Sequence, residues 1–282
     1  MKYQIEEIIG EKVESESGLG GGCIGNASRI KTESGKHYFV KTYSGAGASI
    51  LQNEANGLKE LAKADAIKIP RVIAVTDNFL LLEFIETGRK TRDFSEVFGR
   101  QFARLHKHTS DKFGFYEDNF IGSNPQKNTP PKENWKEFYW ENRLIYQYKL
   151  AEHKGNTTIE LRSAMGRLEN KIDEILNGTE EKPSLLHGDL WGGNYIVSEK
   201  GEPVLIDPAV YYGHREADIG MTCLFGGFDQ SFYKAYNEEF PLPDEWEYRI
   251  DLYKLYHVLN HLNLFGSGYY NQALHILNKY TR

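Results

Sequence analysis

Cysteine is scarce in this sequence, with only Cys23 and Cys223 among its 282 residues. Two cysteines provide neither a disulfide framework nor a thiolate cluster for a metal. Long apolar runs are absent as well, because no stretch approaches the roughly 18 apolar residues needed to span a bilayer. Residues 1–7 are polar and lack the apolar core of a secretion signal. We therefore expect a soluble chain in the cytoplasm with no membrane partner.

An excess of positive charge is also missing, since 34 Lys and Arg stand against 40 Asp and Glu, a net charge of −6. Binding to nucleic acid favours a basic surface, so we expect no nucleic-acid partner. Hydrophobic residues make up 40% of the chain and charged residues 26%, which excludes an intrinsically disordered protein. A chain of this length buries a substantial core in one large or two modest domains.

The chain divides into two regions with different predicted secondary structure. The first ~85 residues alternate β-forming segments and turns around one helix, at 28–32, 36–42, 46–64 (the helix), 72–76 and 79–84. From residue 91 onward longer helical patterns dominate, at 94–108, 135–151 and 157–177 and in several segments between 216 and 280. This pattern predicts an α+β protein with two lobes. Residues 1–86 are expected to form a small antiparallel sheet with one helix, and residues 87–282 a larger, mainly helical lobe.

The segment 187–207 carries the strongest chemical signal. Two short β-forming stretches, 195–197 and 204–206, flank a polar turn and predict a hairpin. If the hairpin is centred between Lys200 and Gly201, Asn194 and Asp207 lie opposite each other, with Cβ atoms about 5 Å apart. An amide oxygen and a carboxylate that converge in this way suit Mg²⁺. We therefore expect Asn194 and Asp207 to be metal ligands.

Asp189 precedes Asn194 by five residues in a glycine-rich loop. This Asp-x-x-x-x-Asn spacing is that of a kinase catalytic loop, in which the aspartate orients the substrate hydroxyl and accepts its proton. Asp189 is therefore the predicted catalytic residue. The alternative is an ordinary loop whose solvated aspartates cap neighbouring elements.

A glycine-rich segment lies near the N-terminus and includes Gly20, Gly21, Gly22 and Cys23. It follows a polar stretch and leads into a strand, so it does not fit a dinucleotide-binding fingerprint, which runs from an apolar strand into a helix. A turn between two strands with exposed backbone amides suits the phosphates of a nucleotide. The alternative is a flexible glycine turn without a ligand.

Lys41 and Glu54 are the predicted partners in nucleotide binding. Glu54 lies on the same helical face as the apolar residues Leu51, Leu58 and Leu61. A carboxylate that faces a core needs a partner, and Lys41, at the end of the preceding strand, supplies one, as in the Lys–Glu pair that holds ATP phosphates in kinases. The alternative is a surface glutamate at the edge of that face. Backbone groups near Glu83 and Ile85, at the end of the last strand predicted for the first lobe, are the expected adenine contacts.

The assembled motifs resemble the fructosamine kinase (ketosamine-3-kinase) family, within the larger group of aminoglycoside phosphotransferase-like and choline kinase-like enzymes. The larger group is indicated by His187-Gly-Asp189, Asn194 and Asp207, and the narrower family by Trp191 within the same loop. Matching segments run from about Gly18 to Gly268 and include 113–128, 135–147, 211–218 and 259–266. The resemblance implies a two-lobed protein-kinase-like fold.

For the chemistry, the resemblance implies ATP- and Mg²⁺-dependent phosphorylation of the C3 hydroxyl of a ketoamine. A ketoamine is the adduct of a sugar with lysine or another amine. The substrate is expected to be either a small ketoamine or a glycated protein. The 3-phosphate then eliminates and releases the amine, which amounts to deglycation. Trp191 and His261 are expected to face the substrate, and Asp218 to support the catalytic loop. For Trp191 the alternative is simple packing under that loop.

Two other functions stay open on the sequence. One is a kinase of another small alcohol, such as an aminoglycoside or choline; a kinase for a polycation needs an acidic cleft, and no acidic cluster stands out in the C-terminal third. The other is a pseudokinase that binds nucleotide without transfer, which the presence of Lys41, Glu54, Asp189, Asn194 and Asp207 disfavours.

Cys23 is a candidate redox switch. A thiol among backbone amides and beside bound phosphate is accessible, and its thiolate is stabilised there. We expect either a monomer or a homodimer linked by a disulfide through Cys23. The alternative is a small buried residue of no redox importance.

Overall fold

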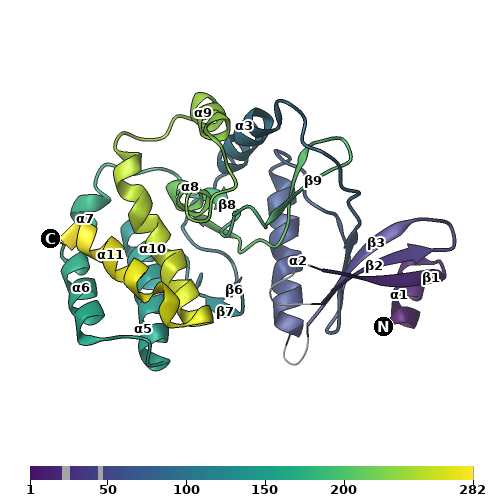
Figure 1. The fold of residues 1–282 in the computed structure, drawn as a ribbon, viewed down its shortest axis with the longest axis horizontal. Helices are drawn as coiled ribbons and strands as arrows, with labels where there is room; N and C mark the ends of the chain where they lie inside the picture. The colour runs from purple at the N-terminus through teal and green to yellow at the C-terminus, as the bar shows by residue number, and fades with distance from the viewer. Residues whose placement is uncertain (21–25, 44–46, 282) are drawn as a thin grey trace.

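The computed structural model describes residues 1–20, 26–43 and 47–281. Its N-terminal part is a five-stranded antiparallel sheet in the order β1-β2-β3-β5-β4. The strands are β1 (Val13–Leu19), β2 (Asn26–Thr32), β3 (His37–Thr42), β4 (Val72–Val75) and β5 (Leu80–Glu83). Figure 1 shows this sheet at one end of the molecule and the helical part at the other, with α2 (Ala48–Lys63) between them.

Each face of the sheet has its own small core. Leu81 on one face packs with Ile5 of helix α1 (Lys2–Ile9), and Leu80 and Leu82 on the other face pack with the apolar side of α2. This division follows the two-residue period of a strand. The strands and α2 confirm the expected antiparallel sheet. The expectation of one helix in this region is wrong, because α1 is a second helix; only Ile5 of its eight residues is buried, so the sequence signal was weak.

The rest of the chain is mainly helical, which confirms the predicted fold class. The segment predicted as one helix at 135–151 is α4 (Trp135–Phe138), a π-helical stretch (Tyr139–Ile145) and α5 (Tyr146–His153). The segment predicted at 157–177 divides into α6 (Ile159–Glu169) and α7 (Ile172–Ile175). The other helices are α3 (Phe94–His106), α8 (Glu216–Thr222), α9 (Gln230–Glu239), α10 (Trp246–Phe265) and α11 (Tyr270–Thr281). None of the helices formed by the described residues is long and apolar enough to cross a membrane.

Three strand pairs lie on the side of the helical part that faces the sheet and α2. They are β6 (Asn119–Ile121) with β7 (Asn124–Gln126), β8 (Ser184–Leu186) with β11 (Tyr211–Gly213), and β9 (Tyr195–Val197) with β10 (Pro203–Leu205). The loops that follow β8 and β10 carry the predicted catalytic residues. The short strands therefore position the site, while the helices behind them supply the core.

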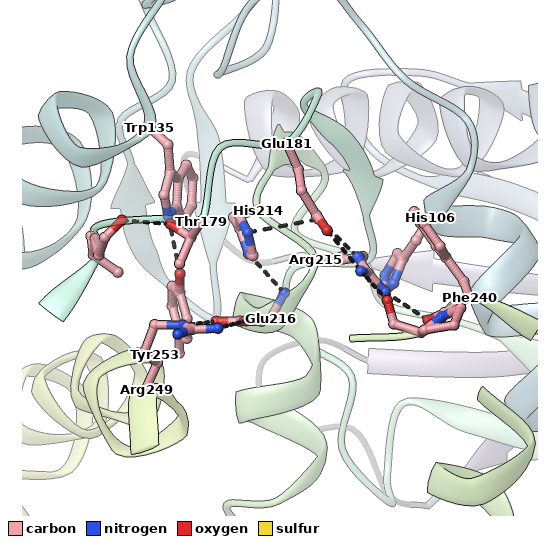
Figure 2. Close-up of polar contacts among 12 residues, drawn as sticks. His106, Trp135, Thr179, Glu181, His214, Arg215, Glu216, Phe240, Arg249 and Tyr253 are labelled. Atoms are coloured by element: carbon pink, nitrogen blue, oxygen red, sulfur yellow. Dashed lines mark hydrogen bonds and ion pairs between the residues drawn. The ribbon is translucent and has the colours of Figure 1, made fainter. Parts of the chain in front are cut away.

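Buried ion pairs anchor the start of α8 (Figure 2). Glu216 accepts two hydrogen bonds from Arg249 of α10, at 2.6 and 2.8 Å, and both side chains are almost fully buried. Beside them, Arg215 donates to Glu181 at 2.7 and 2.8 Å and to the Phe240 carbonyl oxygen at 2.8 Å. A buried charge needs a hydrogen-bonded partner, and here each has one. The first turn of α8 is therefore fixed on two sides.

Buried histidines make the stability of the fold depend on pH. Burial lowers the pKa of His257 to about 3, and it also lowers the pKa values of His106, His187 and His214. Below pH 6.5 the unfolded chain binds protons that the folded chain does not. The free energy of unfolding is therefore highest above the unfolded pKa of about 6.5 and decreases as the pH falls, and for His257 the slope approaches about 1.4 kcal/mol per pH unit.

We expect His257→Gln to reduce that dependence. Between pH 7.5 and 5, the free energy of unfolding measured with urea should decline by about 2 kcal/mol less than in the parent chain, and the difference should arise mainly below pH 6.5. The exposed His153→Gln variant is the control and should keep the parent slope. Parallel slopes for His257→Gln and the parent would contradict the prediction.

Candidate active site

The loop after β8 has a conformation that only glycine permits at its second position. Gly188 has φ +81°, and a Cβ placed on it would lie 2.0 Å from the Ala209 carbonyl oxygen. The close approach is held by hydrogen bonds from the Ala209 N–H to the His187 carbonyl oxygen at 2.9 Å and between His187 Nε2 and the Ile206 carbonyl oxygen at 3.0 Å. The segments before Asp189 and after Asp207 thus run together, with the β9–β10 hairpin between them in the sequence.

Asp218 holds the backbone of this loop through hydrogen bonds, as the resemblance implied. Its carboxylate accepts hydrogen bonds from the backbone N–H groups of His187 at 2.7 Å and Gly188 at 2.8 Å, and lies 3.2 Å from His106 Nε2. Burial alone would raise the pKa of Asp218, but these partners hold it below its usual value. His106 is in turn fixed by the Tyr236 hydroxyl at 2.7 Å. The ion pairs that fix the start of α8 therefore also fix Asp218, and Asp218 in turn holds the backbone of the catalytic loop.

Asp189 and Asn194 contact each other directly. Asn194 Nδ2 donates to the Asp189 backbone oxygen at 2.8 Å and to Asp189 Oδ2 at 3.1 Å. Burial, together with the negative charges of Asp207 and Asp218, raises the pKa of Asp189 well above its usual value, and the hydrogen bond from Asn194 acts against this. A carboxylate of raised basicity at a cavity surface is suited to accept a proton from a hydroxyl group.

The predicted register of the catalytic hairpin is wrong by one residue. Leu205 pairs with Tyr195, and the Ile206 N–H donates to the Asn194 carbonyl oxygen at 3.1 Å, so Asn194 lies opposite Ile206 instead of Asp207. A slip of one residue in a strand turns a side chain to the other face. Asp207 nevertheless reaches the same cavity as Asn194, because its backbone leaves the strand with a left-handed φ of +52°. The sequence offered no sign of this change.

Lys41 joins the sheet to the catalytic hairpin. Its Nζ lies 2.9 Å from Glu54 Oε1, which is the expected ion pair, and 2.5 Å from Asp207 Oδ1. Burial raises the pKa of Glu54 to about 7, although Lys41 acts in the opposite direction. Burial opposes the charge of Lys41 as well, but the two carboxylates raise its pKa above the usual value. The ammonium group is therefore held between a carboxylate of α2 and one of the hairpin.

A cavity of about 210 Å³ joins these groups. Lys41, Glu54, Asp189, Asn194 and Asp207 line it, and so do the two predicted substrate residues, Trp191 and His261. The Trp191 ring covers Gly193, since a Cβ on that glycine would lie 2.4 Å from the ring. The tryptophan thus packs against its own loop and also faces the cavity, so both interpretations of Trp191 describe part of its environment.

The predicted nucleotide contacts are only partly within the described residues. Gly20 follows β1, whereas Gly21, Gly22 and Cys23 lie outside the described residues. Ile85 lines a second cavity of about 240 Å³, together with Glu86 and residues of the β9–β10 turn. Glu83 does not line this cavity, and its N–H donates to the Arg71 carbonyl oxygen at 2.8 Å. Ile85 is therefore the stronger candidate for an adenine contact.

Several residues around the site were not found from the sequence. Phe265 and Asn260 line the cavity from α10, and Asn119 and Phe120 line it from β6. His106 supports Asp218 from α3, more than 100 residues away in the chain. The four cavity residues lie in segments that match the family, but nothing in the sequence assigned them a place in the site, and tertiary structure alone brings them and His106 together.

A sheet with a buried Lys–Glu pair, facing an Asp-x-x-x-x-Asn loop across a cavity, is the arrangement of protein-kinase-like phosphotransferases. In agreement, the fold superimposes on a choline kinase of Streptococcus pneumoniae with a TM-score of 0.68 at 17% identity, over 99% of this chain and 98% of that one. The model of the fructosamine kinase family matches residues 1–282. The chain belongs to the fructosamine kinase family.

Two further relatives agree with this assignment. A chloroplastic protein-ribulosamine 3-kinase of Oryza sativa subsp. indica is 43% identical over 279 residues, which cover 96% of this chain and 80% of the rice protein. The crystal structure of a candidate fructosamine-3-kinase from Thermobifida fusca superimposes with a TM-score of 0.89 at 31% identity, over 99% of this chain and 97% of that one. The resemblance found in the sequence is thus confirmed over the whole chain.

Proposed function

We propose that this chain is an ATP-dependent kinase that transfers the γ-phosphoryl group to the C3 hydroxyl of ketoamines. The observation that carries the proposal is the convergence of Asp189, Lys41 and Asp207 on one cavity that Trp191 and His261 also line. Family membership and the kinase fold supply the ATP dependence. Phosphorylation at C3 prepares the ketoamine to eliminate phosphate and release its amine, so the outcome is deglycation of small amines or of glycated proteins.

Mg²⁺ is the proposed metal, and the residues present fit it. Asn194 uses Nδ2 in both of its hydrogen bonds to Asp189, which leaves Oδ1 as its ligand atom, and Asp207 contributes a carboxylate from the same cavity. These are the oxygen ligands that Mg²⁺ prefers, with phosphate oxygens and water completing its shell. When bound, the ion neutralises negative charge on the phosphates.

The side chains of the chain take distinct parts in this proposal. Asp189 orients the C3 hydroxyl and accepts its proton. Lys41, fixed by Glu54, holds phosphate oxygens, and the amides of the glycine-rich segment that begins at Gly20 cover them. The backbone near Ile85 receives the adenine. Trp191 offers a flat surface to the sugar.

The lobes are proposed to divide at residue 86, into a nucleotide-binding part (1–86) and a catalytic part (87–282). The backbone next to this boundary is bound to the catalytic hairpin, since the Glu199 N–H donates to the Glu86 carbonyl oxygen at 2.7 Å and the Gly88 N–H donates to the Val197 carbonyl oxygen at 3.0 Å. We also propose a cytoplasmic location. The redox role of Cys23, with its disulfide-linked dimer, stays a hypothesis.

Mass spectrometry of ketoamines after incubation with enzyme, ATP and Mg²⁺ tests the function. We expect the ribulose–lysine and fructose–lysine adducts to gain one phosphate and then to yield free lysine. Aminoglycosides and choline serve as competing substrates. The carboxylates that line the cavity are Glu54, Asp189 and Asp207, all engaged in the catalytic group, so the described part of the cavity has no acidic wall for a polycation. Phosphate gained only by a competing alcohol would refute the proposed substrate.

Replacement of Lys41 by methionine tests the nucleotide side of the site. The variant keeps an unbranched side chain of similar length but has no charge to hold the phosphates. We expect kcat to fall by about 10²–10³-fold, the usual effect of removing one preorganised electrostatic contact in an active site. Steady-state kinetics at saturating ATP measures it. Lys2→Met, in the exposed first turn of α1, is the control and should keep parent activity; a Lys41→Met enzyme within threefold of the parent would remove Lys41 from the mechanism.

A further inference from the structure

Arg143 is a fully buried cation that forms no ion pair with any carboxylate of the described residues. Its guanidinium group instead donates hydrogen bonds to the carbonyl oxygens of Lys127 and Asn142 and to Asn128 Oδ1, the last at 2.7 Å. It also lies over the Tyr211 ring, 3.9 Å from the ring centroid. Burial of a charge without a counter-ion is costly, so a role beyond packing is indicated.

The backbone that carries Arg143 is unusual as well. It belongs to the π-helical stretch Tyr139–Ile145 between α4 and α5. A π-helix is rare, and where one interrupts an α-helix it frequently lies at a functional site. The stretch brings the guanidinium group to Lys127 and Asn128, the residues that follow β7. The proposed function has so far given this arrangement no part.

The guanidinium group of Arg143 orients a chain of buried amides. Arginine has donors but no acceptor, so Asn128 turns its Oδ1 toward Arg143. Asn128 Nδ2 therefore points away from Arg143 and donates to Asn119 Oδ1 at 2.8 Å. Asn119 in turn directs its Nδ2 to the Val210 carbonyl oxygen at 2.8 Å. Each amide is thus fixed in one of its two possible orientations.

Gln126 of β7 joins the same network. Its Oε1 accepts a hydrogen bond from the Tyr256 hydroxyl at 2.7 Å. Its Nε2 donates to Asn119 Oδ1 and to the Ala209 carbonyl oxygen, both at 2.9 Å. The side-chain nitrogen and oxygen atoms of Asn119, Gln126 and Asn128 all have partners. A buried polar network that is fully satisfied holds one arrangement rigidly.

The network ends on the two carbonyl groups that follow Asp207 by two and three residues. Asp207 itself has the left-handed φ of +52°, and such a conformation persists only where the surrounding structure holds it. We propose that Arg143 is a positioning residue, which fixes the segment after Asp207 through Asn128 and Asn119 and thereby sets the affinity of the site for its metal ion. The proposal rests on the proposed function, because it takes Asp207 as a ligand of Mg²⁺.

Binding of Mn²⁺, which like Mg²⁺ prefers six oxygen ligands, tests the proposal without catalysis. Electron paramagnetic resonance measures the free Mn²⁺ during a titration of the enzyme saturated with a non-hydrolysable ATP analogue. We expect Arg143→Met to raise the Kd for Mn²⁺ by about tenfold, because Asn128 loses the donor that orients it. Asn128→Asp should also raise the Kd by about tenfold, since its carboxylate accepts from Arg143 but cannot donate to Asn119.

Asn128→Asp separates the positioning role of Arg143 from a role in stability alone. The variant keeps Arg143 and supplies it with a carboxylate partner, so a role in stability alone would leave the Kd for Mn²⁺ at the parent value. This holds even if Arg143→Met fails to fold. Asn124→Asp is the matched control, because Asn124 is also buried and lies 3.3 Å from a cation, Lys154 Nζ, but its Nδ2 donates to Asn260 Oδ1 and not to the segment after the metal ligand.

The Kd for Mn²⁺ of Asn124→Asp should stay within about twofold of the parent value, and circular dichroism of Asn128→Asp should match the parent. A Kd for Asn128→Asp within about threefold of the parent, or an equal rise for Asn124→Asp, would overturn the positioning role. A parent enzyme that binds Mn²⁺ together with the nucleotide but phosphorylates no ketoamine would overturn the proposed function and not the positioning role. A parent enzyme without nucleotide-dependent binding of Mn²⁺ would overturn the metal site and its positioning residue together.

Discussion

Asp189→Asn is expected to lower kcat for ketoamine phosphorylation by at least about 10³-fold, at the upper end of what a general base contributes. The amide keeps the size of the side chain but has little ability to accept a proton, and the carboxylate it replaces has a pKa raised by burial. The contact with Asn194 Nδ2 can persist through the amide oxygen, so the fold should be unchanged. Single-turnover measurement of phosphate transfer at saturating ATP determines the effect.

Asp77→Asn provides the control for this variant. Asp77 lies in the exposed turn between β4 and β5, so its replacement should leave kcat within twofold of the parent. For Asp189→Asn, KM for ATP should also stay close to the parent value, because the proposed role of Asp189 concerns the acceptor hydroxyl and not the phosphates. If Asp189→Asn retained a tenth of the parent kcat, the assignment of Asp189 as the base would be wrong.

Arg249→Met is expected to have the largest effect on stability, a loss of about 3–5 kcal/mol in the free energy of unfolding. The substitution leaves the Glu216 carboxylate fully buried without the two hydrogen bonds that it now accepts at 2.6 and 2.8 Å. Chemical denaturation at pH 7, followed by fluorescence, measures the change. Activity should decrease as well, because α8 carries Asp218 and thereby supports the catalytic loop.

Two further variants identify the orphaned charge as the cause. In Glu216→Leu/Arg249→Met neither charge of this pair remains, so most of the lost stability should return. Lys279→Met breaks an ion pair with Asp251, in which the two side chains are 38% and 31% exposed. The expected loss in the free energy of unfolding is below about 1 kcal/mol. If the double variant were as unstable as Arg249→Met, lost packing would be the better explanation.

Much of the catalytic half of the site could be predicted because its residues lie within one short segment. Asp189, Asn194 and Asp207 span fewer than twenty residues, and the spacing between them reflects local geometry. Glu54 was placed by helical periodicity, which also made Lys41 its partner, and the structure has this ion pair at 2.9 Å. Local patterns of this kind survive folding because the backbone periods of helices and strands are fixed.

The register of the hairpin shows where such reasoning fails. Sequence alone does not tell a turn centred on Lys200 from one centred a bond later, and the difference reverses the direction of every side chain on one strand. Similarly, the rings of Trp191, Phe225 and His261 lie next to one another, although they come from the catalytic loop, the segment after α8, and α10. Nothing in the spacing of these residues reveals that tertiary packing brings them together.

The left-handed backbone at Asp207 implies that activity and stability are opposed at this position. A residue with a Cβ in this conformation carries a local strain of about 1–2 kcal/mol, which glycine avoids. Selection for stability alone would therefore favour glycine at this position and lose the carboxylate. The proposed binding of a metal needs a carboxylate there, so attempts to improve the thermal tolerance of the chain should leave this position untouched.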